Sequence, residues 1–289
     1  MKQNDYPEVN LSAWSKVGEG GNGTTYENPA YPDMLLKLNN AHSNQLEPVK
    51  QEFDRSVAVS RLGLPTPAMY QIVRVGDAYA SLSERIRDKK SLSRICHDEP
   101  QRTEEMARLL ARLGRQLADT PCDTSYFPNR KEQALQAVDS ARILNKKTRA
   151  KIRAYIETLP DSTGCSHGDF QPGNVILSGG QCYWIDLGRF AYGAPLFDIG
   201  HLYMVCQVYA PMKQVQDIFH MSLEQFHRFW DAFATEYTGS EDHARFDRLA
   251  GKHAAIDVLL RPIFQKPSFL EKIFLDIYAI KLVRQYFAD

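Results

Sequence analysis

Three polar side chains in a fixed order constrain this chain more than any other feature of its sequence. Asp169 lies in the run that begins at His167, Asn174 follows five residues later, and Asp186 comes twelve residues after Asn174. The segment between Asn174 and Asp186 reads as two short strands that turn at Gly179-Gly180, which predicts a hairpin. Such a hairpin would bring Asn174 and Asp186, at its two ends, to one place in the fold.

The same order of side chains is typical of enzymes that transfer a phosphoryl group. In that reaction one carboxylate orients the attacking hydroxyl and receives its proton, while two further oxygen ligands hold Mg²⁺ against the triphosphate. The sequence therefore predicts that Asp169 is the catalytic base and that Asn174 and Asp186 bind Mg²⁺. We expect His167 to be a core histidine that holds the loop by hydrogen bonds and not a direct participant.

A glycine-rich segment upstream fits the pattern G-x-G-x-x-G. Residues 11–17 and 33–38 read as strands on either side of it, so the segment would be a hairpin turn and not the strand-to-helix turn of a dinucleotide-binding fold. The backbone N–H groups of such a hairpin can cover the phosphates of a nucleotide, although a glycine-rich turn is usually only a turn. The candidate phosphate-binding residues are Gly18, Gly20, Gly21, Asn22 and Gly23.

Lys37 follows a short apolar run, where an isolated charge needs a reason. Pairing with the α- and β-phosphates of a nucleotide is one explanation, and a solvated strand lysine is the plain alternative. Glu52 lies on the next predicted helix, residues 45–62, and can orient Lys37 through an ion pair. Glu47 is the fallback partner, but Pro48 after it suggests a position in the first helical turn.

The pattern of the chain changes from strands to helices near residue 90. Residues 70–84 read as a hairpin that turns at Gly76. Apolar spacing further along predicts helices over residues 104–117, 131–144 and 147–159. The sequence thus predicts a small β-rich N-lobe, residues 1–86, which binds the nucleotide. A larger, mainly helical C-lobe, residues 87–289, would carry the catalytic loop, the metal site and the acceptor-binding region.

Together these residues resemble the aminoglycoside phosphotransferase and choline kinase family, protein-kinase-like enzymes that act on small molecules. The run His167-Gly-Asp with Asn174 is the family's form, since protein kinases usually have an arginine in the middle position. Asp186-Leu-Gly stands where the family has Asp-Phe-Gly or similar. Residues 194–199 are similar to its Pro-x-x-Asp-Leu segment, and residues 63–67 to the turn after its lysine-pairing helix.

The resemblance covers roughly residues 17–202. Within the family, the chain is most similar to a bacterial branch whose name reflects sequence kinship and not a demonstrated substrate. It implies an α+β, protein-kinase-like two-lobed fold, with a small antiparallel β N-lobe and a larger mainly helical C-lobe. It also implies ATP and Mg²⁺ as cofactors and the roles given above. In the family's pattern, the hinge that contains Glu84 and Ile86 receives adenine through backbone groups, and Asp198 braces the catalytic loop.

Two departures from the family's pattern affect the acceptor side. Many members have a Leu-His pair near the end of the long helix before the catalytic loop, where this chain has Gly114-Arg-Gln-Leu. Arg189 and Phe190 follow the Asp-Leu-Gly run, so the local charge there is not generic. Neither departure touches the ATP chemistry.

Charge and composition restrict the partners and the location. The formal net charge of +0 gives no indication of binding to nucleic acid or to an anionic membrane. No apolar run approaches the ~20 residues of a membrane span, and the first residues lack the apolar core of a signal peptide. Five scattered cysteines are typical of reduced thiols. We therefore expect a cytoplasmic protein with no obligate protein partner evident.

The region from residue 197 onward is rich in aromatic side chains, and in the family it forms the acceptor pocket. Ten Lys/Arg balance eleven Asp/Glu between residues 199 and 289, which does not indicate the clustered carboxylates that a polycationic aminoglycoside needs. A choline-like acceptor needs an aromatic cage, but the candidates recur at helical spacing, which favours a core stripe. They are Phe226, Phe229, Trp230, Phe233 and Tyr237.

We therefore predict an ATP- and Mg²⁺-dependent phosphotransferase that phosphorylates a hydroxyl of a small molecule, as aminoglycoside phosphotransferases do. Choline or ethanolamine, a sugar and a homoserine-like metabolite are the alternative acceptors. A protein side chain is least favoured, because the eight residues between Asp186 and Pro195 are too few for a long activation segment. A nucleotide-binding regulator without turnover is the alternative of another class.

Overall fold

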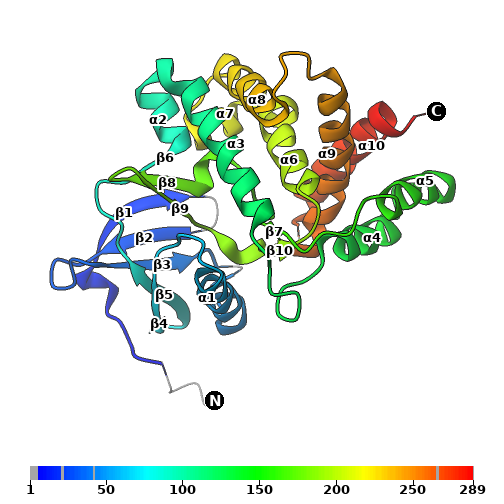
Figure 1. Cartoon of the computed structure of the whole chain (residues 1–289). Coiled ribbons are helices and arrows are strands. Elements are labelled where there is room, and N and C mark those ends of the chain that lie inside the picture. The colour runs from blue at the N-terminus through cyan, green and yellow to red at the C-terminus, as the bar shows by residue number, and fades with distance from the viewer. Residues whose placement is uncertain (1–5, 21–22, 42, 265–266, 289) are drawn as a thin grey trace. The chain divides into compact units, whose positions relative to one another are not determined.

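Five strands form the main sheet, in the spatial order β1-β2-β3-β5-β4, and all neighbours in it are antiparallel. The computed structural model describes residues 6–20, 23–41, 43–264 and 267–288 (Figure 1). The strands of the main sheet are β1 (Ser15–Gly20), β2 (Gly23–Glu27), β3 (Met34–Asn39), β4 (Met69–Val75) and β5 (Ala78–Glu84).

By their internal contacts the residues form two compact units. The sheet unit comprises Met1–Ser91 and Asn174–Gly188, and the helical unit comprises Leu92–Gly173 and Arg189–Asp289. Within the sheet unit, the first strand of the segment Asn174–Gly188 pairs with Lys90 and Ser91. The predicted division into an N-lobe, residues 1–86, and a C-lobe, residues 87–289, stays a prediction.

Each face of the main sheet has its own apolar cluster. Leu36, Val73 and Leu82 form one cluster, against which residues of the N-terminal segment such as Trp14 pack. In the cluster on the other face, Val49 of helix α1 (Leu46–Arg61) packs with the strand residues Ile72 and Tyr79. Alternating side chains thus bury both faces, and β3 lies in the middle of the sheet.

The segment before β1 differs from the prediction of a strand over residues 11–17. Leu11–Ala13 is a single 3₁₀ turn, η1, and the strand begins at Ser15. The prediction was wrong at this end because the Asn10 side chain accepts a hydrogen bond from Ser12 N, 3.0 Å away. A short polar side chain that bonds to the backbone in this way favours a turn over a strand.

The predicted hairpin after Asn174 is present as two strands of a second, three-stranded sheet in the order β6-β8-β9. Val175 pairs with Trp184, and Gly179 and Gly180 turn the chain with φ of 56° and 82°. Positive φ at both positions is the conformation that favours glycine in a two-residue hairpin turn. The strands are β6 (Lys90–Ser91), β8 (Val175–Ser178) and β9 (Gln181–Trp184).

The helical unit is built mainly from α-helices, with one short sheet of β7 (Cys165–Ser166) and β10 (Ala191–Tyr192). Its α-helices are α2 (Leu92–Asp98), α3 (Thr103–Asp119), α4 (Arg130–Ser140), α5 (Lys146–Glu157), α6 (Leu196–Tyr203), α7 (Lys213–Phe219), α8 (Leu223–Thr238), α9 (Ala244–Phe264) and α10 (Phe269–Phe287). Short 3₁₀ turns are η2 (Pro100–Arg102), η3 (Pro172–Asn174) and η4 (Leu187–Arg189), and η5 (Met204–Tyr209) is a π-helix that continues α6.

The helices of this unit pack against one another in pairs (Figure 1). Helix α3 packs against α8, α6 against α9, and α9 against both α4 and α10. Phe226, Phe229, Trp230 and Phe233 of α8 are all fully or almost fully buried. The core-stripe interpretation is therefore confirmed for these four residues, while Tyr237, the fifth candidate, is only partly buried.

Helix α4 ends at Ser140, four residues before the predicted end. Ala141 leaves the helical conformation with ψ of 79°, and Leu144 then closes a turn onto Ala141 O at 3.1 Å. Leu144 is nevertheless buried in the core of the helical unit. Its apolar character made the helix look longer, because a buried leucine in a turn gives the same signal as one on a helix.

The predicted fold class is confirmed: an antiparallel N-terminal sheet precedes a mostly helical remainder. Within the part of the chain that the structure describes, no helix has both the length and the apolar character that spanning a membrane requires.

Candidate functional site

The predicted catalytic loop lies in the helical unit, directly after β7. Gly168 has φ of +79°, and a Cβ atom there would lie 2.9 Å from the Arg189 Cβ. Both the backbone conformation and the lack of space therefore require glycine at this position. The tight turn at Gly168 sets the direction in which Asp169 leaves the strand.

Asp198, in the first turn of α6, holds this loop through its carboxylate. Oδ2 accepts a hydrogen bond from His167 N at 2.7 Å, and Oδ1 accepts bonds from Gly168 N at 2.8 Å and Ser166 Oγ at 3.0 Å. Ser166, His167 and Asp198 are all buried. Buried backbone N–H groups need such partners, so one side chain satisfies the loop and fixes its shape.

The residues on either side of Asp169 are also fixed. Asp169 N donates to His167 Nδ1 at 3.3 Å, and the Phe170 ring is buried against Phe233 of α8, with 6.1 Å between ring centroids. A Cβ at Gly114 of α3 would lie 2.8 Å from Phe170 Cζ. The glycine in place of the expected Leu-His pair thus makes room for the aromatic ring that follows Asp169.

Asp169 has a close partner that the sequence did not indicate. Its Oδ1 lies 2.9 Å from Nε2 of His201 on α6, and the other ring nitrogen of His201, Nδ1, lies 3.2 Å from Oδ2 of Asp257 on α9. The Asp169 side chain is 21% exposed, against 3% for His201 and 11% for Asp257. A histidine therefore connects a partly accessible carboxylate to a nearly buried one.

The charges in this cluster shift one another's pKa values. Burial alone would lower the pKa of His201, but Asp257 and Asp169 outweigh it and raise the pKa to about 9. Burial would raise the pKa of Asp169, but the hydrogen bond and charge of His201, with Arg189 and His167 beyond, hold it well below its usual range. The pKa of Asp257 is lowered against burial, mainly by His201. The cluster thus favours two carboxylates and one imidazolium at neutral pH.

Close packing of α6 and α9 creates this cluster. A Cβ at Gly200 would lie 2.6 Å from the carbonyl carbon of His253, so only glycine permits the approach. His253 stands one helical turn before Asp257 on α9, and Gly200 directly precedes His201. The glycine therefore allows the side chains of His201 and Asp257 to come within hydrogen-bond distance.

In the sheet unit, Lys37 of β3 lies between two carboxylates. Its Nζ is 2.6 Å from Glu52 Oε1 on α1 and 3.4 Å from Asp186 Oδ1 after β9. Asn39 Nδ2 donates to the other oxygen of Glu52 at 3.2 Å, so both oxygens of that carboxylate are held. Glu47, the alternative partner, lies in the first turn of α1.

Charge balance around Lys37 keeps it protonated. Burial alone would lower its pKa, but Asp186 and Glu52 outweigh burial and raise the pKa above its ordinary value. Arg55, one turn after Glu52 on α1, donates to the carbonyl oxygen of Gly188. Helix α1 thus contacts both the lysine and the segment that follows Asp186.

Asp186 has φ of 61°, the left-handed conformation that costs energy for residues other than glycine but is tolerated best by Asp and Asn. Asn174, at the other end of the hairpin, is buried, and its carbonyl oxygen accepts from Ile185 N at 3.1 Å. The hairpin therefore brings the two predicted metal ligands to one end. One carboxylate and one amide are oxygen donors of the kind Mg²⁺ prefers, so the residues fit the predicted ion.

Among the described residues, no group of three or more His, Cys, Asp or Glu side chains could hold a metal ion by itself. Mg²⁺ bound to phosphates commonly uses one or two protein carboxylates and takes its remaining ligands from phosphate and water. The Asn174–Asp186 pair matches that kind of site.

Gly18, Gly20 and Gly23 lie on the antiparallel strands β1 and β2, in which Gly20 pairs with Gly23. A Cβ at Gly23 would lie 2.9 Å from Asn39 Cα, and one at Gly18 would lie 2.7 Å from Thr25 Oγ1. Both glycines therefore permit close strand packing, which is a structural reason for their presence. Gly21 and Asn22, also predicted to contact phosphates, lie outside the described residues.

The predicted hinge follows β5. Glu84 N donates to Ala68 O at 2.7 Å, and Glu84 Oε2 accepts from Ala68 N at 3.0 Å. Ile86 is buried two residues later. Glu84 thus fastens the end of β5 to the segment before β4, and any contact of the hinge with adenine stays a prediction.

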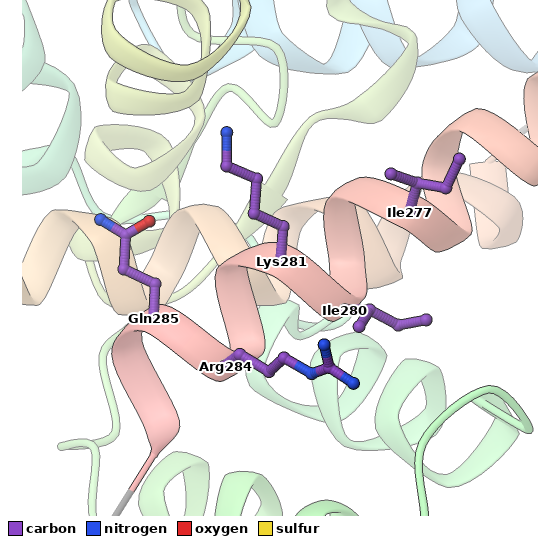
Figure 2. A pocket seen from close by; sticks show the side chains of 5 residues that line it. All are labelled: Ile277, Ile280, Lys281, Arg284 and Gln285. Atoms are coloured by element: carbon purple, nitrogen blue, oxygen red, sulfur yellow. The ribbon is translucent and has the colours of Figure 1, made fainter.

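A surface hollow of about 570 Å³ lies on α10, far along the sequence from the predicted residues. Figure 2 shows the side chains that line it: Ile277, Ile280, Lys281, Arg284 and Gln285. They come from one helix and include none of the predicted site residues.

Sequence reasoning missed His201, Asp257 and Asn39. His201 and Asp257 are 56 residues apart, and neither belongs to a recognisable motif. One signal was present: His201 stands among the mainly apolar residues 199–206, where a polar side chain needs a partner. Asn39 follows Lys37 by two residues and thus lies on the same face of β3.

The sheet unit with its paired lysine, followed by a helical unit with a loop-held aspartate, defines the class of kinase-like phosphotransferases. The chain belongs to the phosphotransferase enzyme family, whose model matches residues 18–235. Among curated proteins, a search by sequence finds no match.

Solved structures of similar fold cover almost the whole chain. The apo form of a thermostable mutant of aminoglycoside phosphotransferase APH(4)-Ia has a TM-score of 0.61 and 14% identity, over 96% of this chain and 95% of that chain. The streptomycin–ATP complex of APH(2'')-IIa has a TM-score of 0.59 and 16% identity, over 94% and 93%. A choline/ethanolamine kinase family protein from Mesorhizobium loti has 0.56 and 13%, over 95% and 87%. At these identities the likeness shows the fold.

Proposed function

We propose that the protein transfers the γ-phosphoryl group of Mg-ATP to a hydroxyl of a small molecule. The observation that carries this proposal is the lysine held between two carboxylates, Lys37 with Glu52 and Asp186. A partly buried cation between two carboxylates suits the phosphates of a nucleotide, and one of these carboxylates, Asp186, is a predicted metal ligand. The ATP bound in the similar APH(2'')-IIa structure supports the choice of donor.

In this proposal the sheet unit binds the nucleotide. Lys37 pairs with the α- and β-phosphates while Glu52 and Asn39 fix its direction. Asn174 and Asp186 would hold Mg²⁺, which when bound neutralises charge that develops on the phosphate oxygens. Gly18, Gly20 and Gly23 form the hairpin whose backbone would cover the phosphates, and the strand end at Glu84 and Ile86 would receive adenine.

The helical unit supplies the base. Asp169 is ionised, since its pKa is held well below its usual range by His201 despite burial. An ionised carboxylate on a fixed loop can orient the acceptor hydroxyl and receive its proton as the phosphoryl group transfers. His167 and Asp198 act on the loop and not on the substrate, through the hydrogen bonds that they make with it.

The acceptor region does not single out a polycationic aminoglycoside, because ten Lys/Arg balance eleven Asp/Glu between residues 199 and 289. Sugars, homoserine-like compounds and choline or ethanolamine therefore belong in the first tests with aminoglycosides. The cytoplasmic location predicted from the sequence stays part of this proposal.

The test is an ADP-release assay with Mg-ATP and a panel of these acceptors, run on wild type, Asp169→Asn and the surface control Asp217→Asn. We expect one acceptor class to give ADP release that falls by about 10²–10⁴-fold in Asp169→Asn, the usual contribution of a general base. The affinity for Mg-ATP, measured by calorimetry, should stay within about threefold in both variants. Normal turnover in Asp169→Asn would overturn the assignment of the base.

The same assay separates the enzyme from the regulator alternative. A regulator would bind Mg-ATP but release no ADP above the Asp169→Asn level with any acceptor. A protein that does not bind Mg-ATP at all would contradict both.

A further inference from the structure

The cluster of Asp169, His201 and Asp257 contains an unusual arrangement of one ring between two carboxylates. His201 Nε2 lies 2.9 Å from Asp169 Oδ1, and Nδ1 lies 3.2 and 3.3 Å from the two oxygens of Asp257. Both ring nitrogens are thus within hydrogen-bond distance of a carboxylate. A neutral imidazole carries one N–H and can donate to only one of them, whereas an imidazolium donates to both.

The surroundings of His201 favour the charged ring. Asp169 faces it from the catalytic loop, and Asp257 faces it from α9. Arg189 and His167 act on Asp169 from the loop side, and Arg189 with Arg261, whose Nε is 3.9 Å from Asp257 Oδ2, acts on Asp257. Burial lowers the pKa of His201, but the two carboxylates outweigh it and raise the pKa to about 9.

Two other groups complete the neighbourhood. His253, one turn before Asp257, is buried with its pKa lowered to about 4 by burial, so it is neutral at physiological pH. Tyr209 of η5 lies beneath Arg261, and burial raises the pKa of Tyr209 to about 12, so it is also neutral. Neither adds a charge that would compete with the two carboxylates for His201.

We propose that His201, charged and anchored by Asp257, is a positioning residue that fixes the rotation of the Asp169 carboxylate and keeps it ionised for catalysis. The inference rests on the proposed role of Asp169 as the base. A bond to Oδ1 stops the carboxylate from rotating about its Cβ–Cγ bond, so the other oxygen keeps a constant direction. An error of about 1 Å in the position of a catalytic group can cost about 10²-fold in rate.

A proton relay is the alternative use of the same three residues, and the geometry disfavours it. An imidazolium with both protons in place cannot accept the proton that Asp169 takes from the acceptor, unless it first gives a proton to Asp257. A relay would therefore need two coupled transfers, from His201 Nδ1 to Asp257 and from Asp169 to His201 Nε2. The positioning role needs no proton to move through His201.

The first experiment measures the charge of His201 directly and needs no acceptor. Long-range ¹H–¹⁵N spectra of protein labelled at its eight histidines report the protonation of each ring, and His201→Gln identifies the His201 signals. We expect His201 to remain an imidazolium to about pH 9 and its pKa to fall by at least one unit in Asp257→Asn and in Asp169→Asn, since each loses a carboxylate partner. A His201 that titrates near 6.5 in wild type would overturn the proposal, whether or not the protein is a kinase.

The second experiment measures turnover against pH with the acceptor found in the panel. The rate should fall above about pH 9 in wild type, because His201 then loses its proton, and the fall should move to lower pH in Asp257→Asn. His201→Phe, which removes both donors, should lower kcat about 100-fold with KM for Mg-ATP within about threefold. His201→Gln keeps a neutral donor and should retain more activity than His201→Phe while losing the fall near pH 9.

His243 provides a matched control, because it also lies between two carboxylates in the helical unit: Nδ1 is 3.0 Å from Asp247 and Nε2 is 3.9 Å from Asp231. His243→Gln should leave kcat and its pH profile unchanged. An equal loss in His243→Gln and His201→Gln, or wild-type kcat in a folded His201→Phe, would contradict the positioning role. If wild type has no turnover with any acceptor, the proposed function fails, while the titration still decides the state of His201.

Discussion

Replacing Asp198 by alanine tests how the catalytic loop is held. The carboxylate accepts from the backbone N–H groups of His167 and Gly168 and from the hydroxyl of Ser166, at 2.7, 2.8 and 3.0 Å. Asp198→Ala removes all three acceptors at once. A methyl group in their place cannot accept a hydrogen bond, and the small cavity is lined by the donors that lost their partner.

The magnitude follows from counting the donors that cannot find another partner. A buried donor left without an acceptor costs about 1–3 kcal/mol, which gives about 2–6 kcal/mol for the two backbone N–H groups. The Ser166 hydroxyl can rotate toward another acceptor and adds little. The variant also no longer has to bury the charge of Asp198, which offsets part of the cost. We therefore expect Asp198→Ala to lower the free energy of unfolding by about 2–4 kcal/mol, within the 5–15 kcal/mol typical of a folded domain.

Urea denaturation followed by circular dichroism measures that change, and hydrogen exchange followed by mass spectrometry locates it. Protection should decrease most in peptides that cover residues 165–171, because these amides lose their acceptor. Asp217→Ala is the matched control: Asp217 pairs with Lys213 on the exposed face of α7, and its loss should change stability by less than about 0.5 kcal/mol.

The conservative variant Asp198→Asn adds a sharper comparison. It keeps one oxygen but places an NH₂ group, itself a donor, against one of the two backbone N–H groups. Its stability should therefore lie near that of the alanine variant and not near wild type. A wild-type unfolding curve for Asp198→Ala, or unchanged exchange over residues 165–171, would refute the claim that this side chain holds the loop.

Two further variants test the nucleotide half of the site and the packing that forms the His201 cluster. Lys37→Met should weaken Mg-ATP binding at least tenfold, about 1.4 kcal/mol, in calorimetry, while Lys50→Met on the exposed side of α1 should not; equal affinities would contradict the phosphate-binding role. Gly200→Ala should destabilise the protein by about 1–3 kcal/mol in thermal or urea unfolding, because its methyl group would lie 2.6 Å from the carbonyl carbon of His253; an unchanged midpoint would show that α6 and α9 can separate freely.

Local patterns in the sequence predicted what depends on short stretches of chain. The alternation around Gly179-Gly180 predicted the hairpin, and the hairpin alone brings Asn174 and Asp186 to one end. The helix over residues 45–62 was predicted to within a residue at each end. In each case neighbours in sequence set the geometry, so a periodic pattern is sufficient.

The partners of Asp169 could not be predicted in this way. His201 and Asp257 meet only because α6 and α9 approach closely at Gly200, and nothing in the periodicity of either helix indicates which helix packs against which. Residue spacing also could not distinguish a helix end from a buried turn, which is why Leu144 extended the predicted helix too far. Long-range packing, and not local preference, decides both features.

Helix α6 holds the backbone of the catalytic loop through Asp198 and the carboxylate of Asp169 through His201, two contacts one helical turn apart. The loop and its carboxylate are therefore attached to the same short rigid element. If Asp169 is the base, as proposed, it cannot adjust to an acceptor whose hydroxyl arrives slightly out of place. Discrimination between similar alcohols would then depend on how each molecule binds. A change of acceptor would require substitutions in the residues that line the acceptor pocket and none in α6.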